Sequence, residues 1–324
     1  MYRYLVKKNS AYLLSLVFLC ALLPFMLEEF HLSIVIFLLI DLILVTSFRL
    51  ITTMGLWSFA HIPLMSVGGY TSGLLVIKLG WPFWFSLPIA ISVTAVVSFL
   101  IGLPCLKVMG YQFFIASYAA GEAIRWIYIM FRNPFGSYAG IGIVPRPDSL
   151  IGITFHTTIA YYFLVLFFCV LSLAILYRLE NCRIGTTVKA IAENSDICRA
   201  VGINVYGYKV LIFIISSSFA GVAGVLFSHF TGTASPADYT FVYGINILIF
   251  TIVGGPEIFA GPIIGAASLT ILREILRDLL EYLPLIYGVV LIVVVLTLPN
   301  GLSGLREWFL VLSNKIIIFK KRSL

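Results

Sequence analysis

Residues 183–209 read RIGTTVKAIAENSDICRAVGINVYGYK and form a polar island in an otherwise apolar chain of 324 residues. Five of the 21 lysines and arginines lie between Arg178 and Lys209. Apolar segments stand on both sides of this island, and each is close to the roughly 20 residues that cross a bilayer as a helix. The island is therefore predicted to be an exposed loop between two membrane-spanning segments.

The composition of the whole chain places it in the membrane. Hydrophobic residues make up 61% of the sequence and charged residues only 11%. Soluble domains are nearer about half apolar and a quarter charged. The apolar runs are continuous and do not alternate with period two, which predicts helices and not barrel strands. The expected fold class is an all-α integral membrane protein.

Ten apolar segments are predicted to be membrane-spanning helices. They lie at 11–27, 32–48, 57–77, 83–105, 111–131, 159–177, 208–228, 242–254, 258–273 and 283–299. The eighth and ninth are short and flank a break at Gly254, Gly255 and Pro256, a pattern typical of half-helices inside a bundle. Spans 2–5 and 7–10 begin on opposite sides of the membrane. This permits an inverted repeat, although no sequence echo marks one.

Basic residues predict the orientation of these spans. They cluster before the first span, in the loop 178–209 and after the last span. Because the side rich in lysine and arginine is cytosolic, both termini and this loop are predicted inside, and the loop 132–158 outside. The chain then divides into a tail with the first span (1–31), a membrane core (32–305) and a basic cytosolic tail (306–324).

The polar island itself has the pattern of two short helices. Ile184, Val188 and Ile191 form one apolar stripe at helical spacing. Asn194 or Ser195 suits the start of a second helix, and Gly202 suits its left-handed end. The stripe fits either the bilayer surface or a socket on a partner protein. The shortness of the helices and the acids of the loop favour the partner.

The residues of this loop also carry a family resemblance. Arg183-x-Gly185, Lys189-Ala190-Ile191-x-Glu193 and Ala200-x-Gly202 resemble the cytoplasmic coupling segment of ABC-importer permeases. The likeness is to branched-chain amino-acid permeases of the LivM type in particular. Other motifs in matching order extend it over residues 32–305: Ser58-Phe59-Ala60-His61, Gly68-x-Tyr70-Thr71, Gly121-Glu122-x-x-Arg125, Gly254-Gly255-Pro256 and Gly261-Pro262.

The resemblance implies a role, partners and a location. The chain would be the permease subunit of an ATP-driven importer in the bacterial cytoplasmic (inner) membrane, and its favoured substrates would be branched-chain amino acids. A homologous second permease (LivH-like), two ATPase subunits that hold ATP and magnesium, and an external solute-binding protein are the implied partners. The residues expected to couple this chain to the ATPases are Arg183, Gly185, Ala190, Glu193, Ala200 and Gly202.

The sequence departs from the family pattern in the outer loop. Residues 136–142 read GSYAGIG, where the family commonly has a Thr-Gly-Gly turn. Because this loop is expected to face the binding protein, the departure keeps the transport role but leaves the substrate open. An ABC permease for urea or short amides is the alternative within the family.

No motif of an enzyme is present in the sequence. It has no Gly-x-x-x-x-Gly-Lys-Ser/Thr run that would cradle ATP, and no His-Glu-x-x-His or Gly-x-Ser-x-Gly motif. The five cysteines lack metal-ligand spacing. The net charge of +7 is explained by the orienting residues and needs no nucleic acid. We expect neither catalysis nor a metal or cofactor on this chain.

Polar residues within the spans are the candidates for a translocation path. A charge such as Asp41 costs about 2.5–3.5 kcal/mol at the centre of a span, so it either lines a path or bonds a neighbouring helix. The candidate path residues are Asp41, Ser58, His61, Tyr70 and Asn246. An ion-coupled transporter that uses Asp41 or Glu122, or a channel-like facilitator, is the rival interpretation.

Small residues are expected to serve close helix packing. Lipid gives helices no hydrophobic drive to associate, so glycines at contact faces allow the close approach that stabilises a bundle. Gly68 and Gly69 in the third span and Gly221 and Gly224 in the seventh are candidates for such faces. The predicted helix break and its packing involve Gly254, Gly255, Pro256, Gly261 and Pro262.

Overall fold

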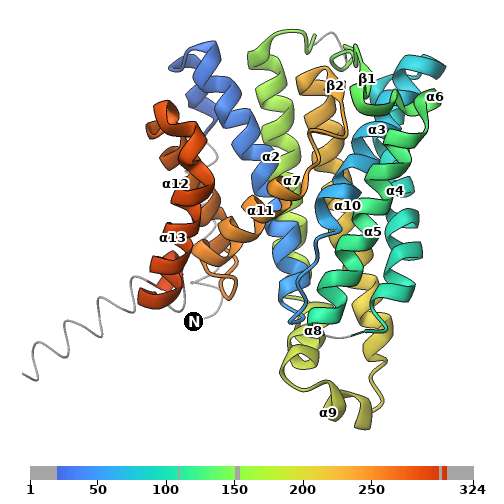
Figure 1. Ribbon diagram of the computed structural model, residues 1–324, viewed down its shortest axis with the longest axis vertical. Helices are drawn as coiled ribbons and strands as arrows, with labels where there is room; N and C mark the ends of the chain where they lie inside the picture. The colour runs from blue at the N-terminus through green and yellow to red at the C-terminus, as the bar shows by residue number, and fades with distance from the viewer. Residues whose placement is uncertain (1–19, 109, 150–153, 299–300, 305–324) are drawn as a thin grey trace, which may run out of the picture.

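The computed structural model describes residues 20–108, 110–149, 154–298 and 301–304. These residues form a bundle of α-helices with a two-stranded β-ribbon at one end (Figure 1). The helices are α2 (Glu29–Thr52), α3 (His61–Leu79), α4 (Phe83–Cys105), α5 (Tyr111–Met130), α6 (Arg132–Phe135), α7 (Thr158–Glu180), α8 (Arg183–Glu193), α9 (Ser195–Ala200), α10 (Val205–Thr231), α11 (Phe241–Gly254), α12 (Gly261–Ile275) and α13 (Leu283–Thr297). The 3-10 helices are η1 (Leu23–Phe25), η2 (Ser137–Ala139), η3 (Arg277–Tyr282) and η4 (Leu302–Gly304).

The all-α membrane fold is confirmed. Among the described residues, six helical segments are long and apolar enough to cross a bilayer: α2, α3, α4, α7, α10 and Leu283–Gly304. Each predicted span from 32–48 onward overlaps a helix, while 11–27 lies largely outside the described residues. The tail 306–324 lies outside them too. The number of ten crossings, the positions of the termini and the inverted repeat stay predictions.

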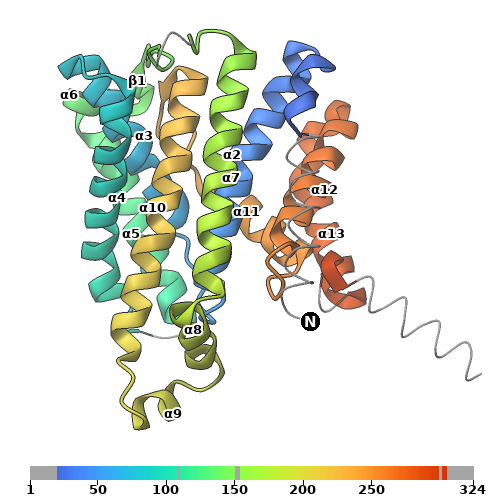
Figure 2. The same cartoon turned by 180° about the vertical axis from the view of Figure 1, so that it is seen from behind.

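The helices fall into two groups that meet at α2. Helix α10 packs against α3, α4 and α2, and α7 packs against α2. Helices α11, α12 and α13 contact one another, and they contact the first group mainly through α2. Figures 1 and 2 show α12 and α13 at one side of the bundle, α8 and α9 at one end and the ribbon at the other. We call these ends the α8 end and the ribbon end.

Glycines allow α3 and α10 to lie almost backbone to backbone. A Cβ added at Gly68 would overlap the carbonyl of Gly221, and one at Gly224 would overlap the carbonyl of Met65. At Gly69 an added Cβ would lie 2.6 Å from the hydroxyl of Tyr239. The predicted use of these glycines for helix packing is therefore confirmed.

The ribbon end is closed by part of the loop 132–158. Strand β1 (Ile141–Gly142) pairs antiparallel with β2 (Thr233–Ala234), which directly follows α10. The N–H of Val144 donates to the carbonyl of Gly232 (2.9 Å), and Nδ1 of His229 bonds the carbonyl of Pro145 (2.6 Å). The loop is thus fixed to the end of α10.

Helix α11 begins part-way along the bundle. After β2 the chain runs from the ribbon end toward the middle of the molecule, where α11 starts (Figure 1). Tyr239 is 2% exposed and packs near Phe227, with ring centroids 5.9 Å apart. Phe241, the first residue of α11, packs on Phe59 just before α3, with centroids 4.8 Å apart. With 14 residues, α11 covers only about 21 Å, which agrees with the predicted half-helix.

Replacing Gly224 with leucine should destabilise the bundle. The side chain would force α3 and α10 apart at Met65, and overpacking of this kind costs about 1–3 kcal/mol or more. We expect a lower apparent melting temperature of the detergent-solubilised protein. Gly288→Ala in α13 is the matched control, because an added Cβ meets nothing within 4 Å there. Equal melting temperatures for Gly224→Leu and the wild type would contradict close packing of α3 on α10.

The predicted orientation can be tested with two exposed residues at opposite ends. Cys198 is only 6% exposed and is a poor probe, whereas Val201 at the α8 end is 71% exposed and Ile143 at the ribbon end is 91% exposed. In a chain whose five native cysteines are replaced, Val201→Cys should react with an impermeant maleimide only in inside-out vesicles. Ile143→Cys should react only in right-side-out vesicles. The opposite pattern would overturn the predicted topology.

Candidate coupling site

Helices α8 and α9 form a helix–turn–helix whose ends are capped as the sequence predicts. The side chain of Asn194 accepts hydrogen bonds from the N–H groups of Asp196 and Ile197, both at 3.0 Å. Asn194, and not Ser195, is therefore the cap of α9. Gly202 has φ +85°, as the predicted left-handed end of this helix requires.

The apolar stripe of α8 packs within the chain itself. Val188 is 1% exposed and belongs to the main core, and Ile184 packs against that core. Ile191 is 3% exposed and packs with Cys198 and Val205 in a small cluster of its own. The stripe is thus covered by its own chain, and neither a bilayer surface nor a partner's socket is needed to bury it.

The opposite face of this element is exposed. Of the residues expected to couple to an ATPase, Arg183, Ala190, Glu193, Ala200 and Gly202 are exposed. Two apolar side chains, Ile197 (63% exposed) and Val201 (71%), project beside them. The sequence analysis missed this pair, although two large apolar residues four apart in a polar loop are a readable signal.

Gly185 has a different place from the other expected coupling residues. It is buried, and a Cβ at this position would overlap the backbone carbonyl of Glu180. Glycine at this position lets α8 lie directly on the last turn of α7. It therefore fixes the position of α8 and does not form part of the exposed face.

A recess opens beside the exposed face at the α8 end. It has a volume of about 360 Å³ and lies between the α2–α3 turn and the α8–α9 element. Polar side chains of Glu193, Asn194, Ser195 and Lys209 contribute to its lining. The α8 end therefore combines a protruding, exposed helix–turn–helix with an adjacent recess, a shape suited to docking a protein.

A buried ion cluster lies directly behind this element. Arg49, in the last turn of α2, is 2% exposed and forms a two-pronged ion pair with Glu180, the last residue of α7. Lys189 of α8 binds the same carboxylate, with Nζ 2.7 Å from Oε1. Removal of one partner from a buried pair of this kind costs about 3–5 kcal/mol. The cluster thus ties α8 to α2 and α7.

The same arginine also holds the helix break. Its Nε donates to the carbonyl of Pro256 (2.7 Å), and one terminal nitrogen donates to the carbonyl of Glu257 (2.9 Å). Its guanidinium carbon lies 5.7 Å from the ring centroid of Phe259. The α11–α12 turn therefore lies against the ends of α2 and α7. The sequence analysis did not single out Arg49, although an arginine within the last turn of an apolar helix was the available signal.

The break itself is built from close backbone contacts. A Cβ at Gly254 would overlap the carbonyl of Gly261, and a Cβ at Gly261 would overlap the carbonyl of Gly255. Pro262 is buried and lies in the first turn of α12, where it needs no amide hydrogen. The five residues expected at the break thus form one tight turn between α11 and α12.

The candidate path residues do not line a common surface. Asp41 accepts a hydrogen bond from the hydroxyl of Tyr243 on α11 (2.6 Å), and Asn246 lies one turn further along that helix. His61 is 2% exposed and bonds Ser47 of α2 through Nε2 (2.9 Å). Asp41 and His61 therefore serve contacts between helices in this conformation.

The other two path candidates are buried elsewhere. Ser58 is 3% exposed and accepts a hydrogen bond from the N–H of Ala60 (3.3 Å). Tyr70 is 1% exposed and stacks on Tyr128 with ring centroids 4.1 Å apart. The hydroxyls of Tyr70 and Tyr239 are buried without a hydrogen-bond partner among the described residues.

A small recess lies where α3, α5 and the start of α11 meet. Its lining is mostly apolar, and Glu122 is its charged member. Glu122 forms an ion pair with Arg125 (2.9 Å), as expected from their spacing on one helix. The lining residues are Phe59, Ile62, Pro63, Tyr118, Glu122, Tyr239, Thr240, Phe241 and Gly244.

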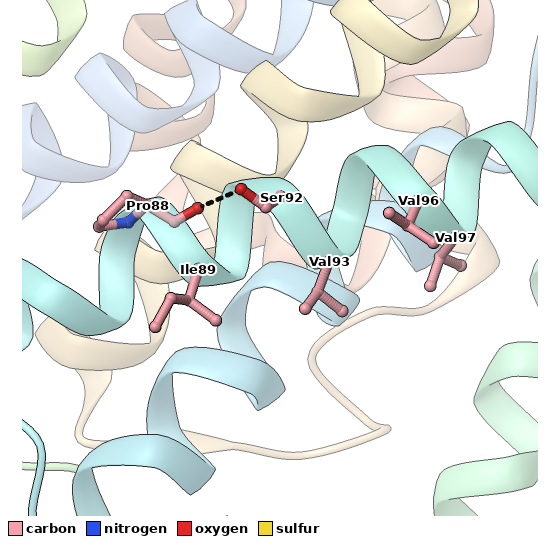
Figure 3. Close-up of a pocket in the computed structure, with 6 residues that line it drawn as sticks. All are labelled: Pro88, Ile89, Ser92, Val93, Val96 and Val97. Atoms are coloured by element: carbon pink, nitrogen blue, oxygen red, sulfur yellow. Dashed lines mark hydrogen bonds between the residues drawn. The ribbon is translucent and has the colours of Figure 1, made fainter.

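Helix α4 presents an apolar groove on its outer side. Figure 3 shows Ile89, Val93 and Val97 along the helix after Pro88, with the hydroxyl of Ser92 donating to the carbonyl of Pro88 (2.8 Å). This open groove has a volume of about 370 Å³. Such a surface suits lipid or another apolar helix.

No group of three histidine, cysteine, aspartate or glutamate side chains gathers to hold a metal ion in the part of the chain that the structure describes. The cysteines of that part are all free. The contacts above are packing, capping and ion-pair contacts, and they position helices.

A family model described as the permease component of the branched-chain amino acid transport system matches residues 30–298. The chain belongs to this family. It is therefore a permease component of a transport system, built as a multi-pass membrane protein. The matched range begins at α2 and reaches the described end of α13, so it includes the α8–α9 element, the ion cluster and the helix break.

Individual relatives agree with the family match. The chain is 29% identical to the high-affinity branched-chain amino acid transport permease LivM of Escherichia coli, over 95% of this chain and 78% of the relative. It is 28% identical to LivM of Salmonella typhimurium, over 91% of this chain and 75% of the relative. LivH of Escherichia coli is 31% identical over 46% of this chain and 48% of its own length. No solved structure matches the chain.

Proposed function

We propose that this chain is the membrane-spanning subunit of an ATP-driven ABC importer that moves branched-chain amino acids across the bacterial cytoplasmic membrane. The observation that carries the proposal is the family match over residues 30–298, together with LivM relatives aligned over more than nine-tenths of the chain. The chain supplies the path and its alternating access. It is not itself an enzyme.

The energy comes from two separate ATPase subunits that dock on the α8 end. The sequence has no phosphate-cradling loop of its own. The exposed face of α8–α9, with Glu193, Ile197 and Val201 beside the adjacent recess, supports a docking role. ATP and magnesium are bound by these ATPases.

The translocation path is completed by a second, homologous permease subunit. Relatives named LivH match about half of this chain, which supports a pair of related subunits. The outer groove of α4 supplies apolar surface for lipid or for that subunit. An external binding protein delivers the solute at the ribbon end, where Ile143 and Tyr138 are exposed.

The substrate is a small zwitterion with an apolar side chain. The family match and the LivM relatives, which are branched-chain amino acid permeases, support a solute of that kind. The recess between α3, α5 and α11 has a volume of only about 10 Å³ and is too small to hold it. Urea and short amides remain the alternative within the family. The two residues named for the ion-coupled alternative are each bonded within the chain, Asp41 to the hydroxyl of Tyr243 and Glu122 to Arg125.

The complete transporter should concentrate leucine, isoleucine and valine inside proteoliposomes. We expect uptake to require ATP, the second permease, the ATPases and the binding protein, because each supplies a part that this chain lacks. The measurement is radiolabelled uptake, with urea and acetamide as competing solutes. Uptake by this chain alone under a proton or sodium gradient would favour the ion-coupled alternative. If urea inhibited the uptake preferentially, the assigned substrate would be urea and not a branched-chain amino acid.

The double variant Glu193→Ala/Gly202→Ala should uncouple ATP hydrolysis from uptake. It removes an exposed charge of the docking face and strains the end of α9, because alanine at φ +85° costs about 1–2 kcal/mol. We expect insertion to be preserved and stimulation of the ATPase by the loaded binding protein to be lost. Gly80→Ala is the control, since it places alanine at φ +64° at the other end of the molecule. Normal stimulation in the double variant would refute the docking role.

A further inference from the structure

The α8–α9 element and the α11–α12 turn are connected through side chains, although they are far apart along the chain. The main packing contacts of α8 are with α7, α9 and α10, whereas those of α12 are with α11 and α2. The two elements are joined through Glu180 and Arg49. This connection crosses the boundary between the two groups of helices.

Each member of the connection binds the next one directly. Lys189 on α8 lies 2.7 Å from Oε1 of Glu180, and a terminal nitrogen of Arg49 lies 3.1 Å from the same oxygen. The second carboxylate oxygen of Glu180 pairs with the other terminal nitrogen of Arg49. Two further N–H groups of Arg49, one on Nε and one on a terminal nitrogen, donate to the carbonyls of Pro256 and Glu257.

Close backbone contacts lie at both ends of this connection. At one end, Gly185 brings the backbone of α8 onto the carbonyl of Glu180 without an intervening side chain. At the other end, Gly254 and Gly261 hold α11 and α12 in backbone contact. A displacement of α8 therefore moves the carboxylate of Glu180, and the arginine that it holds can carry this movement to the turn.

The hydrogen bonds of Arg49 suit the transmission of movement from Glu180 to the α11–α12 turn, which is more than neutralising the charge of Glu180 requires. A guanidinium has donors in a fixed planar fork, and here the fork meets a carboxylate and two carbonyls from different segments. A lysine ammonium is a compact point charge on a flexible stem and cannot hold all of these partners at fixed angles. Lysine at this position therefore keeps the charge and loses the directional link.

We propose that Arg49 is a positioning residue that couples movement of the α8–α9 element to the α11–α12 turn, with Glu180 as its anchor. This inference rests on the proposed function, in which ATPases move α8. It adds the route by which that movement reaches α11, the half-helix that starts part-way along the bundle. Arg49 contacts neither the ATPase face nor the recess between α3, α5 and α11.

The test measures two quantities: leucine uptake per ATP hydrolysed, and co-purification of the ATPase subunits with this chain. The whole transporter, with its second permease, ATPases and binding protein, is reconstituted with Arg49→Lys in this chain. We expect ATPase subunits to co-purify and unstimulated ATP hydrolysis to remain unchanged. Leucine uptake per ATP hydrolysed should fall about tenfold, which corresponds to a loss of about 1.4 kcal/mol of coupling. Arg125→Lys is the matched control, since Arg125 also pairs with a glutamate but, among the described residues, forms no hydrogen bond or ion pair with a distant segment.

A merely structural role predicts a different result. Loss of folding would lower uptake and ATP hydrolysis together, so the uptake per ATP hydrolysed would stay at the wild-type value. A wild-type ratio for Arg49→Lys in an assembled transporter would overturn the inference and leave the proposed function intact. Failure of wild-type chain to recruit ATPases would instead overturn the proposed function.

A second variant and a spin-label measurement of movement keep the inference testable if Arg49→Lys folds poorly. Glu180→Gln keeps the shape of the anchor but removes its charge, and it should lower the same ratio. Spin labels at Thr187 on α8 and at Ile258 in the turn, which is 48% exposed, should move together when nucleotide binds to the wild-type complex. In either variant the label at Thr187 should still move and the label at Ile258 should not. Joint movement in a variant, or failure of both variants to assemble, would count against a coupling role.

Discussion

The buried charge of Arg49 constrains the arrangement of three separate segments. A guanidinium that is 2% exposed must find a counter-charge and acceptors for its remaining donors, because an unpaired buried charge is strongly destabilising. Its partners come from the end of α7 and from the α11–α12 turn. Satisfying one side chain therefore fixes the ends of α2 and α7 and the α11–α12 turn relative to one another, at the end of the bundle that carries α8.

Helices contact one another in two ways in this structure, through close glycine packing and through directional hydrogen bonds. The α3–α10 contact is made by glycine backbones such as Gly68 and Gly224, which pack closely but have no directional preference of their own. The Arg49 cluster is directional, because each bond needs a particular atom at a particular angle. A transporter needs interfaces that can change their packing as well as elements that move as units. Smooth glycine faces suit the first need, and the ion cluster suits the second.

The sequence predicted those features that depend on local chemistry. Helix positions followed from bilayer thickness and apolar run length, and the Asn194 cap and the Gly202 end followed from turn chemistry. Arg49 and Glu180 are 131 positions apart, so no local pattern could predict their contact. The burial of His61 against Ser47 likewise depends on how α2 meets α3. For the same reason, the path residues chosen by polarity did not gather into one lining, and Gly185 proved to be a packing position.

The two ends of α11 are held by different kinds of contact. In the segment before α11 Tyr239 is 2% exposed, whereas Phe241 and Val242 at the start of the helix are 40% and 56% exposed. Phe241 meets Phe59 and Tyr118 through ring contacts at 4.8 and 4.9 Å between centroids. Ring contacts lose little when rings slide, whereas a hydrogen bond is lost within about an ångström of displacement. Directional hydrogen bonds hold the α11–α12 turn, whereas ring contacts hold the start of α11. A displacement of the turn can therefore shift the start of the helix without breaking a hydrogen bond there.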